Sequence, residues 1–183
     1  MKVALSYLLS LGGAGVLTWG VLMAMAVNCN YPAIRFRLLH FLRTQPWQAE
    51  MMTKTKPGSF YDGIHAAMKT AGMLGIRDPD QIALATRPTY DAAVSTIKFK
   101  WKSILGKVKL GGGLVIAGVA TAIGVHTNPA LHIIILVGAI GAAVWMFVTK
   151  NDCERYVMLA RLEILPDVDR CVAEGRYGKP PIV

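Results

Sequence analysis

Few residues in this chain have the types and spacing that chemistry requires. The 183 residues contain no nucleophile elbow, no phosphate-binding Walker loop and no zinc-ligand spacing. The glycine run at residues 111–113 is followed by no Lys-Ser/Thr pair. Cys29, Cys153 and Cys171 lack redox spacing, and an odd number argues against a closed disulfide framework. We therefore expect a protein that is not an enzyme and that holds no metal or other cofactor.

Two histidines, His126 and His132, flank an Asn-Pro turn near the middle of an uncharged stretch. Such a pair can bind a metal or respond to pH, because imidazole exchanges a proton near neutrality. The alternative, which we favour from the sequence, is that both are polar residues at a membrane interface.

Charged residues are absent from two long stretches, Val3–Val27 and Leu110–Thr149. Only 17% of the chain is charged, whereas soluble domains usually carry about 25%. A helix needs about 20 residues to cross the hydrocarbon core, so the first stretch is long enough for one span. The second stretch is long enough for two, Leu110–Val125 and Leu131–Val148, divided at the Asn-Pro turn. The expected fold is an all-α membrane bundle of three transmembrane helices with long cytoplasmic helical extensions.

A secretory signal peptide is the alternative interpretation of the first stretch. Lys2 would be its basic end, and Ala24-Met25-Ala26 resembles a cleavage site. The uncharged run is longer than the roughly 7–15 apolar residues of a signal peptide, so we favour a retained anchor.

Basic residues predict the orientation of the spans. Between the two uncharged stretches there are thirteen Lys/Arg against five Asp/Glu, and cytoplasmic loops carry such an excess. Five of these residues precede the second span: Lys98, Lys100, Lys102, Lys107 and Lys109. They can contact anionic lipid headgroups or serve as a simple flank. The net charge of +9 fits this membrane interpretation better than nucleic-acid binding. We expect a multi-pass protein of a bacterial inner membrane, with the N-terminus outside and the C-terminus in the cytoplasm.

The chain then divides into four segments: a first transmembrane helix at 1–30, a cytoplasmic helical segment at 31–109, a transmembrane hairpin at 110–149, and a cytoplasmic C-terminal helix and tail at 150–183. Residues Ala33–Arg43 are expected to continue the first span after Pro32. Further helices are expected at Asp62–Gly75, from Thr86-Arg87-Pro88 through Val125, and at Asp152–Leu165. The tail from Gly175 has little to hold it.

Small residues recur every four positions within the expected spans. The pairs are Gly113 and Ala117, Gly138 and Ala142, and Ala14 and Thr18, and Thr121 extends the first of them. Such ridges let membrane helices pack closely, either within one chain or between subunits. No Asp, Glu, Lys or Arg lies inside a span. This rules out a self-contained proton relay built on charged side chains, and it leaves open a channel wall lined by Thr18, Thr121 or Thr149, with a partner supplying the carboxylate.

The layout resembles the MotA/TolQ/ExbB proton-channel family. It has an outer N-terminal span, a long cytoplasmic stretch, a tight hairpin and a cytoplasmic C-terminal helix, and residues 121–124 (Thr-Ala-Ile-Gly) are similar to a threonine-bearing stretch of a pore helix in that family. The resemblance implies a homo-oligomer, typically a pentamer, around the single helix of a partner, coupling ion flow to mechanical work. The competing class is a structural or assembly subunit of a secretion or conjugation apparatus without ion flux.

Overall fold

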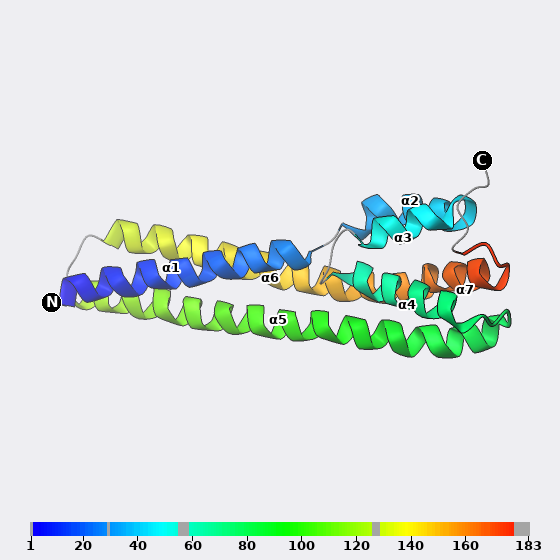
Figure 1. Ribbon diagram of the computed structural model, residues 1–183. Coiled ribbons are helices and arrows are strands. Elements are labelled where there is room, and N and C mark those ends of the chain that lie inside the picture. The colour runs from blue at the N-terminus through cyan, green and yellow to red at the C-terminus, as the bar shows by residue number, and fades with distance from the viewer. Residues whose placement is uncertain (1, 29, 55–58, 126–128, 178–183) are drawn as a thin grey trace. The chain divides into compact units, whose positions relative to one another are not determined.

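The computed structural model describes residues 2–28, 30–54, 59–125 and 129–177, and within them the chain is helical with no strand. The helices are α1 (Lys2–Val27), α2 (Tyr31–Thr44), α3 (Pro46–Lys54), α4 (Phe60–Leu74), α5 (Pro79–Gly124), α6 (Pro129–Glu163) and α7 (Leu165–Ala173) (Figure 1). The expectation of an all-helical chain is confirmed. Helix α3 was missed, because its nine residues carry no strong apolar periodicity.

Three helical stretches are long and apolar enough to cross a membrane, as the sequence predicts. They begin with α1, α5 and α6. Only 28%, 22% and 11% of their most apolar windows are buried within the chain. Each helix therefore presents apolar side chains on most of its circumference.

Helix α5 begins seven residues earlier than expected, at Pro79 instead of Thr86. Asp78 starts it, because its side chain accepts a hydrogen bond from the Asp80 amide at 3.1 Å. Pro88 lies inside the helix, where it removes one backbone hydrogen bond. A buried stripe on one face of the helix offsets that loss, and it comprises Ile82, Thr86, Tyr90, Val94 and Ile97. The prediction of one helix running on to about Val125 is confirmed.

Residues 33–43 do not continue the first helix. Helix α1 ends at Val27, and α2 starts separately at Tyr31 with Pro32 in its first turn. The Asn30 side chain caps it by accepting from the Ala33 amide at 3.4 Å. The break follows from sequence, because an Asn cap followed by a proline is a typical helix start.

The chain forms two compact units. The apolar unit contains Met1–Ala26 and Phe99–Asn151, and the polar unit contains Val27–Lys98 and Asp152–Val183. In the apolar unit α1 runs antiparallel to α5, since Gly13 lies against Gly111 and Ser10 lies against Gly118. Helix α1 runs parallel to α6, since Ser10 bonds His132 and Gly20 lies against Met146 (Figure 1). The start of α1, the end of α5 and the start of α6 therefore lie at one end of this unit.

The polar unit has a core of its own. Buried side chains come from α2, α4, α5 and the α6–α7 junction, and include Leu38, Leu42, Phe60, Ile64, Met68, Ile82, Tyr90, Ile164, Val168 and Cys171. The helix expected at Asp62–Gly75 is confirmed as α4, and the one at Asp152–Leu165 as the end of α6. The residues at the start of the tail are held more firmly than expected: the Tyr177 ring packs over Gly72, and the Arg176 guanidinium donates to the Arg43 carbonyl.

Candidate functional site

Close helix contacts in the apolar unit are made by glycines. A Cβ built on Gly118 would lie 2.2 Å from the Ser10 Oγ and 2.7 Å from the Ser10 backbone nitrogen. A Cβ on Gly13 would lie 2.7 Å from the Gly111 carbonyl oxygen. Helices α1 and α5 can approach this closely only because these positions lack side chains. The packing face within the chain therefore uses glycines that the sequence ridges did not include.

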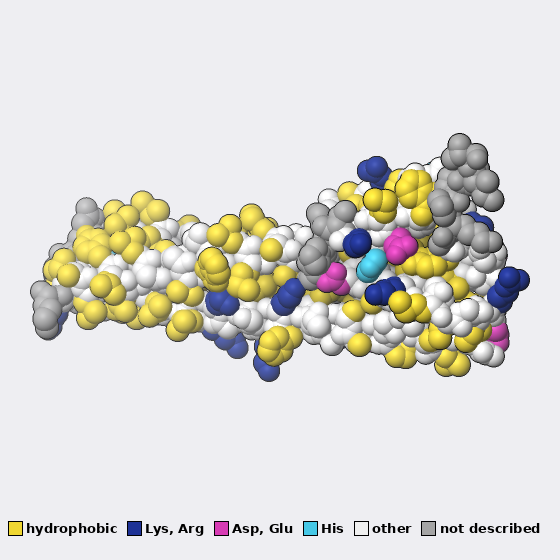
Figure 2. All heavy atoms as spheres, in the orientation of Figure 1, with side chains coloured by type: hydrophobic (Ala, Val, Ile, Leu, Met, Phe, Trp, Pro, Cys, Tyr) yellow, Lys and Arg dark blue, Asp and Glu magenta, His cyan; other side chains and the backbone are white. Residues whose placement is uncertain are grey.

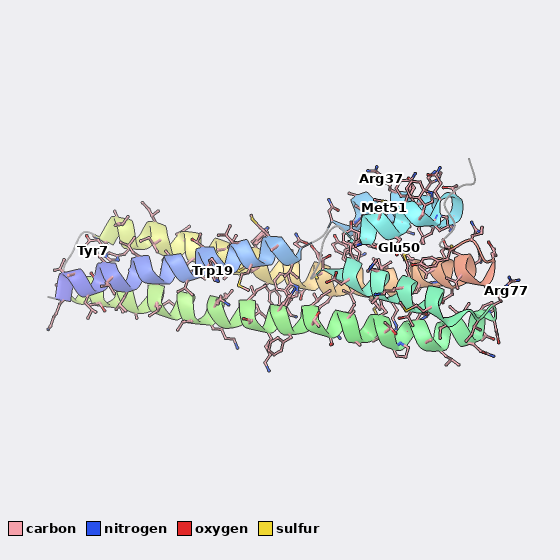
Figure 3. The ribbon with its side chains drawn as sticks, in the orientation of Figure 1. Tyr7, Trp19, Arg37, Glu50, Met51 and Arg77 are labelled. Carbon is pink, nitrogen blue, oxygen red and sulfur yellow. The ribbon has the colours of Figure 1, made fainter. Side chains whose placement is uncertain are left out.

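A buried polar pair lies at the hairpin end of the same unit. His132, in the first turn of α6, is 1% exposed, and its Nδ1 lies 2.8 Å from the Ser10 Oγ of α1. The Tyr7 ring stands 4.8 Å from the imidazole, and Figure 3 labels Tyr7 near the start of α1. The imidazole Nε2 is buried without a hydrogen-bond partner among the described residues. His132 is therefore buried within the unit, and its expected place at a membrane interface stays a prediction, while His126 lies outside the described residues.

A serine bonded to a histidine can act as a nucleophile and base. Here the Ser10 hydroxyl, which bonds to the imidazole Nδ1, is fully buried. A substrate carbonyl therefore has no access to the hydroxyl oxygen. The pair can instead hold a proton, because imidazole has two nitrogens and the hydroxyl can donate or accept.

An apolar groove of about 280 Å³ lies between α1 and α6 within the apolar unit. Small residues predominate on its walls, and four of the predicted residues meet here: Ala14, Thr18, Gly138 and Ala142. The remaining wall residues are Leu17, Val21, Ile135 and Ala139. The groove thus unites two ridges that the sequence placed on separate helices.

The third ridge faces outward. Gly113 and Ala117 are exposed on α5, and a Cβ on Gly113 would meet no atom within 4 Å. This face of α5 is opposite the one that carries Gly111 and Gly118, because residues 111 and 113 are about 200° apart on a helix. A single chain therefore presents an unpartnered ridge as well as a groove.

The three threonines named as candidates for a channel wall all bond to their own helices. Thr18 donates to the Ala14 carbonyl at 2.9 Å and Thr121 to the Ala117 carbonyl at 2.8 Å. Thr149, which is 6% exposed, donates to the Trp145 carbonyl at 2.8 Å. Each hydroxyl proton is engaged, so these residues offer only an oxygen acceptor and a methyl group to a neighbour. The structure does not bring the three together, since only Thr18 lines the groove.

The five lysines occupy one stretch of α5. Lys98 belongs to the polar unit, whereas Lys100, Lys102, Lys107 and Lys109 belong to the apolar unit. Three of them, Lys98, Lys102 and Lys109, are exposed, and the Lys107 ammonium donates to Ser103 at 3.2 Å. In Figure 2 Lys and Arg side chains gather along α5, and the visible face of the apolar unit carries no carboxylate. This arrangement suits contact with anionic headgroups.

Ion pairs between helices connect the parts of the polar unit, and the sequence analysis did not predict them. Three carboxylates in one short stretch each pair with an arginine from another helix: Glu163 with Arg35 at 2.7 Å, Asp167 with Arg43 at 2.8 Å, and Asp169 with Arg87 at 2.9 Å. Asp169 is buried and also accepts from the Thr86 hydroxyl at 2.9 Å. Burial and a hydrogen bond to Glu163 together raise the pKa of Tyr31. Only a fold that juxtaposes residues far apart in sequence could reveal these pairs.

A second hollow, of about 480 Å³, lies on the polar unit. Its wall mixes charges, with Glu50, Lys54, His65 and Lys69 beside the Tyr177 ring. Figure 3 labels Glu50 on α3. Burial raises the pKa of Tyr177, and the neighbouring Glu50 carboxylate raises it further. Neither here nor elsewhere in the described ranges do three metal-ligating side chains converge.

Comparison with known proteins finds no matching family model, no matching curated protein and no matching solved structure. The resemblance to the proton-channel family therefore rests on the sequence layout alone.

Proposed function

We propose that this chain is a non-enzymatic membrane subunit of an oligomeric bacterial envelope complex. The observation that carries the proposal is the pair of complementary surfaces on the apolar unit, the outward ridge of α5 and the groove between α1 and α6. Its spans carry no Asp, Glu, Lys or Arg, so activity would arise in the assembly and not in one chain.

Membrane insertion is supported by the exposure of apolar side chains on all three long helices. Soluble proteins rarely leave so much contiguous apolar surface in water. The pairing of α1 with α5 and α6 agrees with the expected topology, because the start of α1 and the hairpin share one end. The five lysines lie on α5 before the hairpin, away from the end of the unit where the start of α1 lies. A cytoplasmic flank is expected at this position.

In the assembly that we propose, the ridge of one copy enters the groove of the next. The contact is head to tail, because the two surfaces differ, and such contacts close into rings when the rotation allows it. Gly113 and Ala117 would lie against Ala14, Gly138 and Ala142, and small residues on both sides permit close approach. If the family resemblance holds, the ring is a pentamer.

The ring would surround the single helix of a partner, in the manner of a TolQ- or ExbB-like stator. The partner supplies the intramembrane carboxylate that this chain lacks, and threonine oxygens of the ring line the path. The second candidate is a structural subunit of a secretion or conjugation apparatus. It is favoured by the same absence of charged side chains in the spans and requires no ion flux.

Cysteine cross-linking in lipid tests the proposed contact. In a background without the native cysteines, the double variant Ala117→Cys/Gly138→Cys should form disulfides between copies. The matched control is Ala122→Cys/Gly138→Cys, because Ala122 lies on the same helix but is 1% exposed. Cross-links in the first variant alone would support the assembly. A detergent-solubilised particle with the mass of one chain would refute it.

Co-purification then separates the two candidates. A single-span protein with one intramembrane Asp, recovered with the complex, supports the stator. A large secretion ATPase complex supports the structural subunit instead.

A further inference from the structure

Neither helix packing nor assembly requires the buried histidine of the apolar unit. His132 is 1% exposed, its Nδ1 bonds to Ser10 of α1, and its Nε2 has no partner among the described residues. A histidine that served only as packing would have both nitrogens satisfied or replaced by apolar atoms, because a buried polar atom without a hydrogen bond costs free energy. We propose that His132 is a proton-binding site inside the membrane, reached from the hairpin end.

The surroundings allow both protonation states of the ring. With Nδ1–H donated to the Ser10 Oγ, which lies at 2.8 Å, Nε2 keeps a free lone pair. An incoming proton adds to that lone pair, and the neutral imidazole becomes an imidazolium. The bond to Ser10 survives this change, because the hydroxyl oxygen accepts in both states. It becomes charge-assisted, and such bonds are about twice as strong as neutral ones.

The neighbouring side chains can accommodate the positive charge. The Tyr7 ring is 4.8 Å away, within the distance at which aromatic faces attract cations. Between Val3 and Val27 of α1, and between Pro129 and Thr149 of α6, there is no Asp, Glu, Lys or Arg, and Lys2 directly precedes that stretch of α1. Among the described residues, Tyr7 is the titratable side chain that contacts the imidazole.

Polar side chains also mark a path to the end of the unit. Ser6 lies one turn before Ser10 on the same face of α1, and both are fully buried. The Ser6 hydroxyl donates to the Val3 carbonyl at 2.8 Å. The buried polar groups thus follow one another along α1 from its start to the imidazole.

Nitrogen NMR of the full-length chain in lipid nanodiscs tests the site directly. Histidine is labelled with ¹⁵N in the ring, and His132→Asn identifies the His132 signals by their loss. As the pH falls from 9 to 4, we expect the His132 signals to change reversibly from a neutral tautomer to imidazolium. If the ring keeps one neutral tautomer over that whole range, the proposal is wrong.

Two matched hydroxyl deletions sharpen the test. Ser10→Ala should lower the protonated fraction at a fixed pH about 2- to 10-fold, the effect of losing one hydrogen bond to the charged form. Ser95→Ala should leave that fraction unchanged, because Ser95 is exposed on α5 and its hydroxyl bonds to the Ala92 carbonyl of its own helix. Equal effects of the two variants would overturn the role of Ser10. The wild-type titration remains decisive if Ser10→Ala fails to fold, and it does not depend on whether the chain assembles.

Discussion

The crossing of α1 and α5 allows a sharp test with two alanine substitutions in one helix. In Gly118→Ala the added methyl would lie 2.2 Å from the Ser10 Oγ, 2.7 Å from the Ser10 nitrogen and 3.0 Å from the Ser6 carbonyl oxygen. Two of these atoms are backbone, so they can move away only if the helices separate. In Gly113→Ala the same methyl meets nothing within 4 Å.

The comparison isolates the packing contribution to the free energy of unfolding. Both variants gain the same helix propensity, about 1 kcal/mol for Gly to Ala, so this gain cancels between them. The remaining difference in the free energy of unfolding comes from overpacking at Gly118, which typically costs about 1–3 kcal/mol. We therefore expect Gly118→Ala to be less stable than Gly113→Ala by that amount.

The assay is denaturant unfolding of the full chain in detergent, followed by far-ultraviolet circular dichroism, at a protein concentration low enough to keep the chain monomeric. Gly112→Ala is a second control, since its Cβ also meets nothing within 4 Å. Equal stability of Gly118→Ala and Gly113→Ala would show that α1 and α5 do not cross where the structure places them.

Three further predictions concern the polar unit. Asp169→Asn should lower the free energy of unfolding by about 3 kcal/mol, since it leaves the half-buried Arg87 without its partner. Asp91→Asn breaks an exposed ion pair with Arg161 and should lower it by less than about 1 kcal/mol. If chemical denaturation gave comparable losses for the two variants, the burial of Asp169 would be contradicted. Burial raises the pKa of Tyr90 above its ordinary value near 10, so only the unfolded chain ionises there as pH rises past 10. Unfolding should therefore become easier above about pH 10 and be unaffected by this group below it, and Tyr90→Phe should weaken that dependence in thermal melts. Gly72→Ala should displace the Tyr177 ring, because its Cβ would lie 2.2 Å from a ring carbon, and limited proteolysis should then remove the C-terminal tail as fast as in Tyr177→Ala. Unchanged cleavage in Gly72→Ala would argue against that contact.

Sequence was sufficient for the elements that depend on local composition. Uncharged runs and one Asn-Pro turn predicted three long apolar helices, and the stripe from Ile82 to Ile97 explains why α5 tolerates Pro88. The sequence analysis placed the start of α5 too late, at Thr86, because it took Pro88 as a first-turn proline. The helix in fact begins at Pro79, and Pro88 lies inside it.

The candidate site could be predicted only in part, because it depends on which helices are neighbours in space. Small residues every four positions identify a ridge but not its neighbour, so Gly138 and Ala142 could not be matched with Ala14 and Thr18. Likewise, the local sequence around a histidine near a turn does not depend on whether its side chain faces water or a buried serine. Only the register between α1 and α6 decides that His132 meets Ser10.

The order in which the polar unit is synthesised follows from its discontinuity. Its first part, Val27–Lys98, leaves the ribosome before the hairpin, while its second part, Asp152–Val183, leaves afterwards. Until then Arg35, Arg43 and Arg87 have no partner carboxylates, because these come from residues 163–169. The arginines of the first part therefore stay without these partners while the hairpin is being synthesised. Their pairing comes last, so a ribosome that stalls before residue 163 would leave the polar unit without its three long-range ion pairs.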